Sequence, residues 1–348
     1  MLRRLCWRLA PAATTAAGAP SPADAGVGLD ALAPYTTRVE ALCRQMRAAG
    51  AEFDGVAVRP AEETGRGLVA RCAIREGTTV VSVPLHRCGI TADSLLSRDS
   101  LVRGARPPSL DEVRHLMNAR SIRDPVLCEQ VHFALLLAAD HMDPDGPRAG
   151  YYDILPHPAM DDARVIKLHK DVLDPLLLVE WDDYQREMLA ILHQLLRRWD
   201  APQVPPIQVA YWALRTVFSR MHMLPKAGLA PQQVGSTLSY TALSSVDQAD
   251  LQTRWTRRLK SMVSSLIGNP QAAEEYHLVP TLVPLLDMAP HISSSNVRVE
   301  VSTRDAAVGS CAELRAVRDI DAGETVGLRF NASQAPAFLL YRFGFIPQ

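Results

Sequence analysis

The spacing of apolar positions changes twice in the first third of the chain. Between residues 37 and 50 apolar residues recur every three or four positions, and Thr37 and Glu40 have the spacing of a capping box at the start. This pattern predicts one amphipathic helix. From about residues 51 to 84 short β-branched runs alternate with glycines, which predicts strands joined by tight turns.

A helical period then dominates from about Ala92 to Gly268. Residues 126–142 are apolar on nearly every side, which predicts a buried helix, and residues 184–199 carry an apolar stripe on one side. Strands are predicted again from Val279 onward, around residues 297–301, 314–317 and 326–330. The sequence therefore predicts an α+β chain in which two β-rich segments bracket a long helical insert.

Composition places the chain in the globular range, since 47% of its 348 residues are hydrophobic and 22% are charged. Its net charge is −1, from 37 basic and 38 acidic residues, so no overall field attracts it to nucleic acid or to anionic lipid. The six cysteines form no CxxC pair and no zinc-type cluster, which predicts free thiols and no metal. No apolar run reaches the roughly 18 residues of a membrane span, so no membrane partner is expected.

The N-terminal 24 residues differ from the rest of the chain. They include Arg3, Arg4 and Arg8, are rich in Ala, Ser and Thr, and contain no acidic residue before Asp24. This composition is typical of a mitochondrial presequence, and Arg8 interrupts any secretory apolar core. We therefore expect a mitochondrial matrix location, with a disordered Ala/Pro-rich start as the alternative interpretation.

Four sequence blocks lie at or near the junctions of these segments. They are TGRGLVA at 64–70, YYDILP at 151–156, VFSR at 217–220 and LVPLLDMAPH at 282–291. The last block is followed by IDAGE at 320–324 and LLYRFGF at 339–345. Taken singly, each block has an ordinary structural interpretation, such as a turn or a charge at the end of a helix.

Taken together, the order and spacing of the blocks resemble the SET domain of the Rubisco large-subunit methyltransferase class. The resemblance covers residues 52–348 and implies a SET-domain β-fold of small sheets with a knotted C-terminal segment, split by a long helical insert. It also implies that the helical C-terminal substrate-binding domain of this class is lacking. The implied organisation is a presequence at 1–24, an N-terminal helix at 25–51, the first SET part at 52–91, the helical insert at 92–270 and the second SET part at 271–348.

The resemblance also implies a cofactor and a reaction. Members of the family bind S-adenosylmethionine and transfer its methyl group to a protein lysine, or in some members to a histidine. Arg220 matches an arginine that approaches the cofactor carboxylate, where a planar cation suits the anion. The remaining positions that match cofactor-binding residues are Gly65, Arg66, Gly67, Leu68, Asp287 and His291.

The chain departs from the family pattern where polar groups are needed. Pro290 stands in place of an asparagine, and Phe330 and Phe343 stand at the positions of the active-site tyrosines. Each phenylalanine keeps the ring but deletes the hydroxyl, so packing can survive. Methyl transfer needs an oriented amine, and removal of one aligned polar group commonly costs about a hundredfold in rate. No intact catalytic residue is therefore expected, and Pro290 also argues against cofactor binding.

Two functions follow from this pattern. The favoured one is a catalytically degenerate SET protein that acts in mitochondria as a binding subunit or assembly factor of a larger complex, with the mitochondrial ribosome as the natural candidate. The alternative is an active S-adenosylmethionine-dependent protein-lysine N-methyltransferase with an altered pocket. Tyr276 and Tyr341 match neither family position, so they are not expected to replace the missing tyrosines.

A basic stretch within the predicted insert bears on the partner. It contains Arg254, Arg257, Arg258 and Lys260 beside Trp255, and basic groups interleaved with an aromatic residue can contact RNA phosphates. A solvated helix face explains the same pattern. The sequence therefore predicts a protein partner, with local RNA contact as an additional expectation.

Overall fold

The computed structural model describes residues 29–59, 67–97, 107–155, 175–200, 203–225, 278–303 and 309–329. The strands are β1 (Val56–Arg59), β2 (Gly67–Ala70), β3 (Thr79–Pro84), β4 (His222–Pro225), β5 (Leu278–Thr281), β6 (Val297–Thr303), β7 (Ser310–Ala316) and β8 (Thr325–Val326). The helices are α1 (Leu29–Ala48), α2 (Leu85–Cys88), α3 (Ala92–Leu95), α4 (Leu110–Ala119), α5 (Pro125–His141), α6 (Ala149–Tyr152), α8 (Pro175–Arg197), α9 (Ile207–Arg220) and the 3-10 turn η4 (Leu286–Met288).

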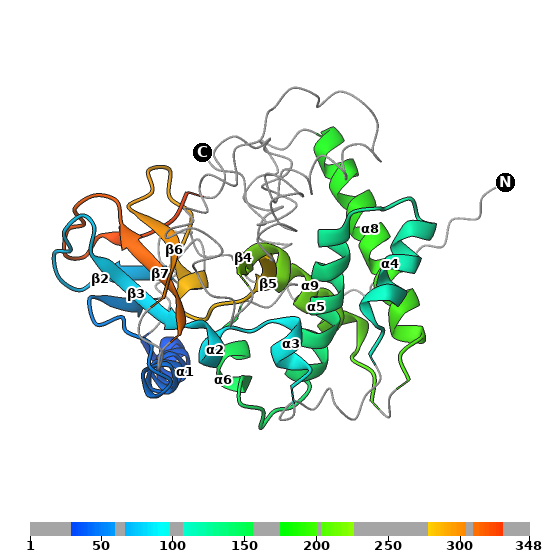
Figure 1. Cartoon of the computed structure of the whole chain (residues 1–348), viewed down its shortest axis with the longest axis horizontal. Helices are drawn as coiled ribbons and strands as arrows, with labels where there is room; N and C mark the ends of the chain where they lie inside the picture. Colours follow the sequence, from blue (N-terminus) through cyan, green and yellow to red (C-terminus); the bar gives the residue numbers. More distant parts are fainter. Residues whose placement is uncertain are drawn as a thin grey trace, which may run out of the picture.

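The strands form small antiparallel sheets that join the two ends of the described chain. The strand orders are β1-β2-β8, β3-β7-β6 and β4-β5. Because β2 pairs with β8 and β3 pairs with β7, the first and last β segments lie side by side, as Figure 1 shows. The predicted α+β architecture, with small sheets split by a helical insert, is confirmed.

The insert packs around one buried helix. Helix α5 contacts α3, α4 and α9, and Phe133 and Leu135 at its centre are fully buried. Helix α8 contributes the predicted apolar stripe, including Met188 and Ile191. In Figure 1 these helices form one side of the molecule and the sheets the other, with the β4-β5 pair between them. Among the described helices none is long and apolar enough to cross a membrane.

Several predicted boundaries are wrong. Helix α1 starts at Leu29, so Thr37 lies inside it and the predicted capping box does not begin it. Capping boxes are found before α3, formed by Thr91 and Ser94, and before α4, formed by Ser109 and Glu112. Helix α8 begins at Pro175, well before residue 184. Residues of good helix propensity extend each of these helices to the N-terminal side of its predicted start. A local sequence signal alone therefore does not locate the first residue of a helix.

The segment predicted as entirely helical also contains a strand. Strand β4 follows α9 directly and pairs with β5, more than 50 positions later in the chain. The four residues of β4 show no alternation of apolar and polar side chains that would predict a strand. The strand forms by pairing with a partner that is distant in the sequence. The strand predicted over residues 326–330 is shorter, because β8 ends at Val326 and only the Leu328 bridge continues the pairing among the described residues.

The polar side of the β3-β7-β6 sheet is a network of ion pairs. Glu300 and Glu313 are buried there, and Arg315 Nε lies 2.9 Å from Glu300 Oε2 while Arg315 Nη2 donates to Glu313 at 3.2 Å. Arg298 also pairs with Glu300.

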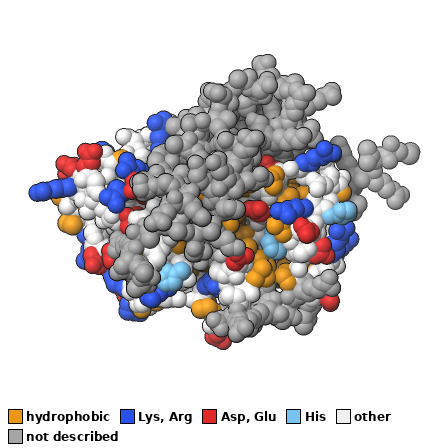
Figure 2. Space-filling view, viewed as in Figure 1, with side chains coloured by type: hydrophobic (Ala, Val, Ile, Leu, Met, Phe, Trp, Pro, Cys, Tyr) orange, Lys and Arg blue, Asp and Glu red, His pale blue; other side chains and the backbone are white. Residues whose placement is uncertain are grey.

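Figure 2 shows basic and acidic side chains interspersed over the described surface on this view. On the face that Figure 2 shows, neither sign forms a broad patch among the coloured residues.

The side chain of Asn296 connects the segment after η4 to residues 324–327 through hydrogen bonds. Its side chain is fully buried; Nδ2 donates to Thr325 O at 2.7 Å and to Glu324 Oε1 at 3.1 Å, and Oδ1 accepts from Gly327 N at 2.9 Å. The hydrogen bond from Arg318 to the same glutamate is the main reason why the pKa of Glu324 falls to about 2. These bonds fix the region after η4 against β8.

Candidate functional site

Arg220 is the last residue of α9. The helix is anchored by buried apolar residues, including Trp212 and Val217, so its end is held firmly beside the start of β4. The Arg220 side chain is only 15% exposed. Its Nη1 donates to the backbone oxygen of Asp287 at 3.0 Å and lies 3.7 Å from the carboxylate oxygen Oδ2 of the same residue.

Asp287 lies in η4 with its side chain fully buried. Leu285, two residues before Asp287 and directly before the turn, has φ 75° and ψ −47°, a region that branched side chains rarely occupy. Such strain persists where the surrounding structure holds it, often at functional sites. The Tyr151 hydroxyl, from α6, donates to Asp287 Oδ2 at 2.7 Å. One carboxylate oxygen is therefore shared by a phenol and a guanidinium from different elements.

The guanidinium of Arg220 has N–H groups that no described residue accepts from. It carries five N–H groups, yet among the described residues only Asp287 accepts from it. A guanidinium that is mostly buried and paired along one edge can accept a planar anion along the other. The arrangement thus fits the carboxylate of an amino-acid moiety, which is the part of S-adenosylmethionine that the sequence resemblance assigned to Arg220.

Pro290 and His291 follow Asp287 in the same segment. The Pro290 carbonyl accepts from Leu328 N at 2.9 Å, and His291 forms a parallel bridge with the same residue. Burial lowers the pKa of His291, and the nearby Arg329 charge lowers it further. Pro290 therefore contributes a carbonyl that holds the chain just after β8, and it offers no side-chain amide or backbone N–H to a ligand.

Leu68 connects the first β segment to this region. It is buried in β2, directly after Gly67, and pairs with Val326 of β8. Just after β8, Leu328 forms a bridge with His291. Strand β8 and the residues that follow it therefore lie between Gly67 and Leu68 of β2 and the segment 287–291. Arg220 reaches the same segment from the helical side.

The other predicted residues lie outside the described part of the chain. They are Gly65, Arg66, Phe330, Phe343, Tyr276, Tyr341, the basic residues Arg254, Arg257, Arg258 and Lys260, and the presequence at 1–24. Their predicted roles stay predictions.

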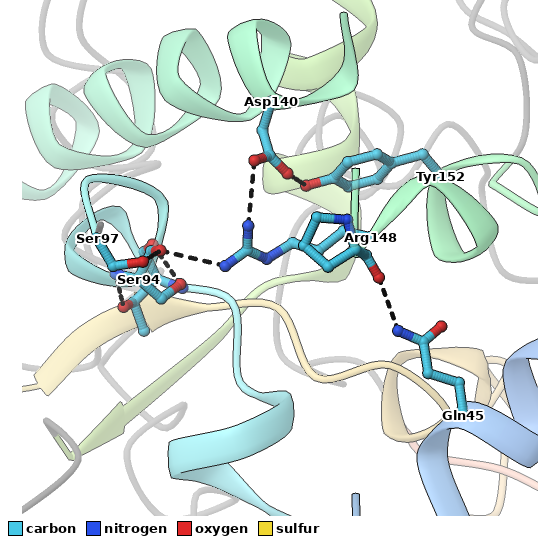
Figure 3. A network of polar contacts seen from close by, with 8 residues as sticks. Gln45, Ser94, Ser97, Asp140, Arg148 and Tyr152 are labelled. Atoms are coloured by element: carbon cyan, nitrogen blue, oxygen red, sulfur yellow. Dashed lines mark hydrogen bonds and ion pairs between the residues drawn. The ribbon is translucent and has the colours of Figure 1, made fainter. Parts of the chain in front are cut away.

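The tandem tyrosines are functional candidates that sequence reasoning missed. Tyr151 reaches Asp287, whereas Tyr152 donates to Asp140 Oδ2 at 2.5 Å, and Arg148 Nη1 donates to the other oxygen of Asp140 at 3.1 Å. Figure 3 shows Asp140 held between Tyr152 and Arg148, with the Arg148 guanidinium also directed at Ser94. Burial, followed by the Asp140 charge, raises the pKa of Tyr152 well above its ordinary value. The only sequence signal was a pair of tyrosines before an apolar loop.

Comparison with solved structures identifies the fold. The chain is similar to the SET domain of LSMT bound to lysine and AdoHcy, with a TM-score of 0.54, 15% identity, and coverage of 90% of this chain and 58% of that one. It is also similar to Rubisco LSMT bound to AdoMet, with a TM-score of 0.50, 16% identity, and coverage of 89% and 56%. No family model and no curated protein matches the chain. The chain has a SET-domain fold and spans somewhat over half the length of these structures.

Proposed function

We propose that this protein is a SET-fold protein of the mitochondrial matrix that has lost methyl transfer and acts by binding, as a subunit or assembly factor of a larger complex. The observation that carries the proposal is the loss of polar groups at three matched positions. Pro290 offers no amide, and Phe330 and Phe343 offer no hydroxyl. The fold is retained while the groups that would orient an amine are absent.

The chemistry of methyl transfer explains why these hydroxyl and amide groups are needed. When bound, S-adenosylmethionine supplies an electrophilic methyl carbon, and the protein must hold a neutral amine in line with it. Hydroxyl and amide dipoles fixed in advance provide that orientation. A phenyl ring at the same position keeps the volume but cannot hold the amine.

One observation favours the alternative, an active protein-lysine methyltransferase. Arg220, Asp287 and Tyr151 form a polar cluster in which some guanidinium N–H groups donate to no described residue, which suits a carboxylate ligand. This cluster supports retention of the carboxylate end of a cofactor site. It does not supply the groups that face the methyl carbon, so the binding function is the better supported.

The proposed partner is a mitochondrial ribonucleoprotein, with the ribosome as first candidate. The presequence-like residues 1–24 support the location, and Arg254, Arg257, Arg258 and Lys260 support contact with RNA phosphates. With a net charge of −1, the chain needs such a local basic patch to contact RNA.

Sedimentation of a tagged chain from isolated mitochondria tests the partner and the location together. We expect the full-length chain to enter mitochondria and to sediment with a large particle that collapses after nuclease treatment. A matched variant lacking residues 1–24 is expected to stay outside mitochondria. Import of that variant would refute the presequence, and slow sedimentation of the full-length chain alone would refute the assembly role.

A further inference from the structure

Two consecutive residues after β8, Gly327 and Leu328, give all four of their backbone polar groups to one loop. That loop is residues 290–296, between η4 and β6. The hydrogen bonds run from Leu328 N to Pro290 O at 2.9 Å, from Ile292 N to Leu328 O at 2.9 Å, from Gly327 N to Asn296 Oδ1 at 2.9 Å and from Asn296 N to Gly327 O at 3.3 Å. The two ends of the loop therefore hold the same two residues.

One peptide unit is held from both sides. The Gly327 carbonyl and the Leu328 N–H belong to the same planar trans peptide, so they point in opposite directions. The carbonyl accepts from Asn296 N and from Ser295 Oγ at one end of the loop, and the N–H donates to Pro290 at the other end. A rotation of this peptide plane breaks the hydrogen bonds on both sides, so we expect them to be made and lost together.

No side chain fits at position 327. A Cβ atom added to Gly327 would lie 2.8 Å from Pro290 O and 2.8 Å from Ile292 Cγ2. Moving the Ile292 side chain would not be enough, because Pro290 O is a backbone atom and is itself the acceptor of the Leu328 N–H. Even alanine would therefore push the loop away from the chain after β8, since only glycine allows so close an approach of backbone.

The loop itself buries little apolar surface. Ser293 and Ser294 are exposed, and residues 290–292 are only partly buried, whereas α5 consists mostly of buried residues. Segments with few buried apolar contacts open at a lower free energy than the core does. Opening of the loop is thus expected while the helical insert stays folded.

We propose that loop 290–296 is a clasp on Gly327 and Leu328, that it opens as one unit, and that its full closure requires glycine at position 327. The clasp begins shortly after Asp287, whose backbone oxygen accepts from Arg220. When it opens, the end of segment 287–291 loses its pairing with Leu328. The clasp is therefore a device that loosens one side of the candidate site without unfolding the insert, whichever of the two proposed functions the protein has.

Hydrogen exchange of backbone amides, followed by NMR, tests the proposal on the unmodified chain. The clasp contains four amide donors, those of Ile292, Asn296, Gly327 and Leu328. We expect all four to show one opening free energy and one dependence on denaturant, with the opening free energy below that of amides at the centre of α5. Opening free energies that differ between the two ends of the loop, or that equal those of α5, would overturn the proposal.

Gly327→Ala tests the requirement for glycine, and Gly55→Ala is its matched control. A Cβ at Gly55 makes only an ordinary contact, 3.7 Å from Ile74 Cδ1. We expect Gly327→Ala to accelerate exchange at the three other clasp amides by at least about tenfold, and Gly55→Ala to leave these rates unchanged. Acceleration confined to residue 328, equal acceleration throughout α5, or no difference between the two variants would contradict the proposal. If Gly327→Ala does not fold, the exchange pattern of the unmodified chain decides.

Discussion

Replacing Asp287 with alanine is expected to lower the free energy of unfolding by about 3–5 kcal/mol. The carboxylate is fully buried and compensates the Arg220 guanidinium, whose side chain is only 15% exposed. Its removal takes the counter-ion from a mostly buried cation and takes the Oδ2 acceptor from the Tyr151 hydroxyl. Equilibrium unfolding in guanidinium chloride at pH 7 measures the change.

Asp183→Ala is the matched control for that experiment. Asp183 pairs with Arg186 at 3.0 Å, but both side chains are exposed, at 48% and 65%. Exposed pairs of this kind contribute at most about 1 kcal/mol, because water screens them. Similar small losses for Asp287→Ala and Asp183→Ala would show that the buried cluster does not stabilise the fold.

The second large effect is expected for Asn296→Ala, at about 2–4 kcal/mol. The fully buried amide satisfies Gly327 N and Thr325 O, which lie on the segment that β8 begins. Alanine leaves both backbone groups buried without these partners and removes one hydrogen bond to Glu324. The measurement is again equilibrium unfolding at pH 7.

Asn118→Ala serves as its control. Asn118 is exposed near the end of α4, so its replacement is expected to change the free energy of unfolding by less than about 0.5 kcal/mol. Because β8 and residues 290–296 together build the second SET part of the site, Asn296→Ala should also weaken ligand binding. A loss no larger than that of Asn118→Ala would contradict the role assigned to this amide.

The sequence predicted those features that depend on local pattern. Helix α5 was expected because its apolar residues lie close together in sequence, and the β segments were expected because β-branched runs and glycines recur locally. The position of Arg220 at the end of an apolar helix was likewise predicted from local sequence. The overall architecture follows from such signals, since each element buries the face that its own residues define.

The missed features depend on distant partners. Tyr151 and Asp287 are 136 positions apart, and nothing local distinguishes this tyrosine from Tyr152 beside it. Strand β4 forms only because β5 lies next to it, and Asn296 became a structural hub only once Glu324 and Gly327 were placed beside it. Single-sequence patterns carry no information on which distant groups will meet.

Methyl transfer itself is the measurement that tests the account most directly. The purified chain is incubated with radiolabelled S-adenosylmethionine and a matrix extract from cells that lack the protein, and label in protein is counted. We expect no incorporation above that seen with the extract alone, because the side chains of Phe330, Phe343 and Pro290 carry no hydroxyl or amide with which to orient an amine. Labelling of a matrix protein that depends on the added chain, and that is lost in Arg220→Ala, would contradict it.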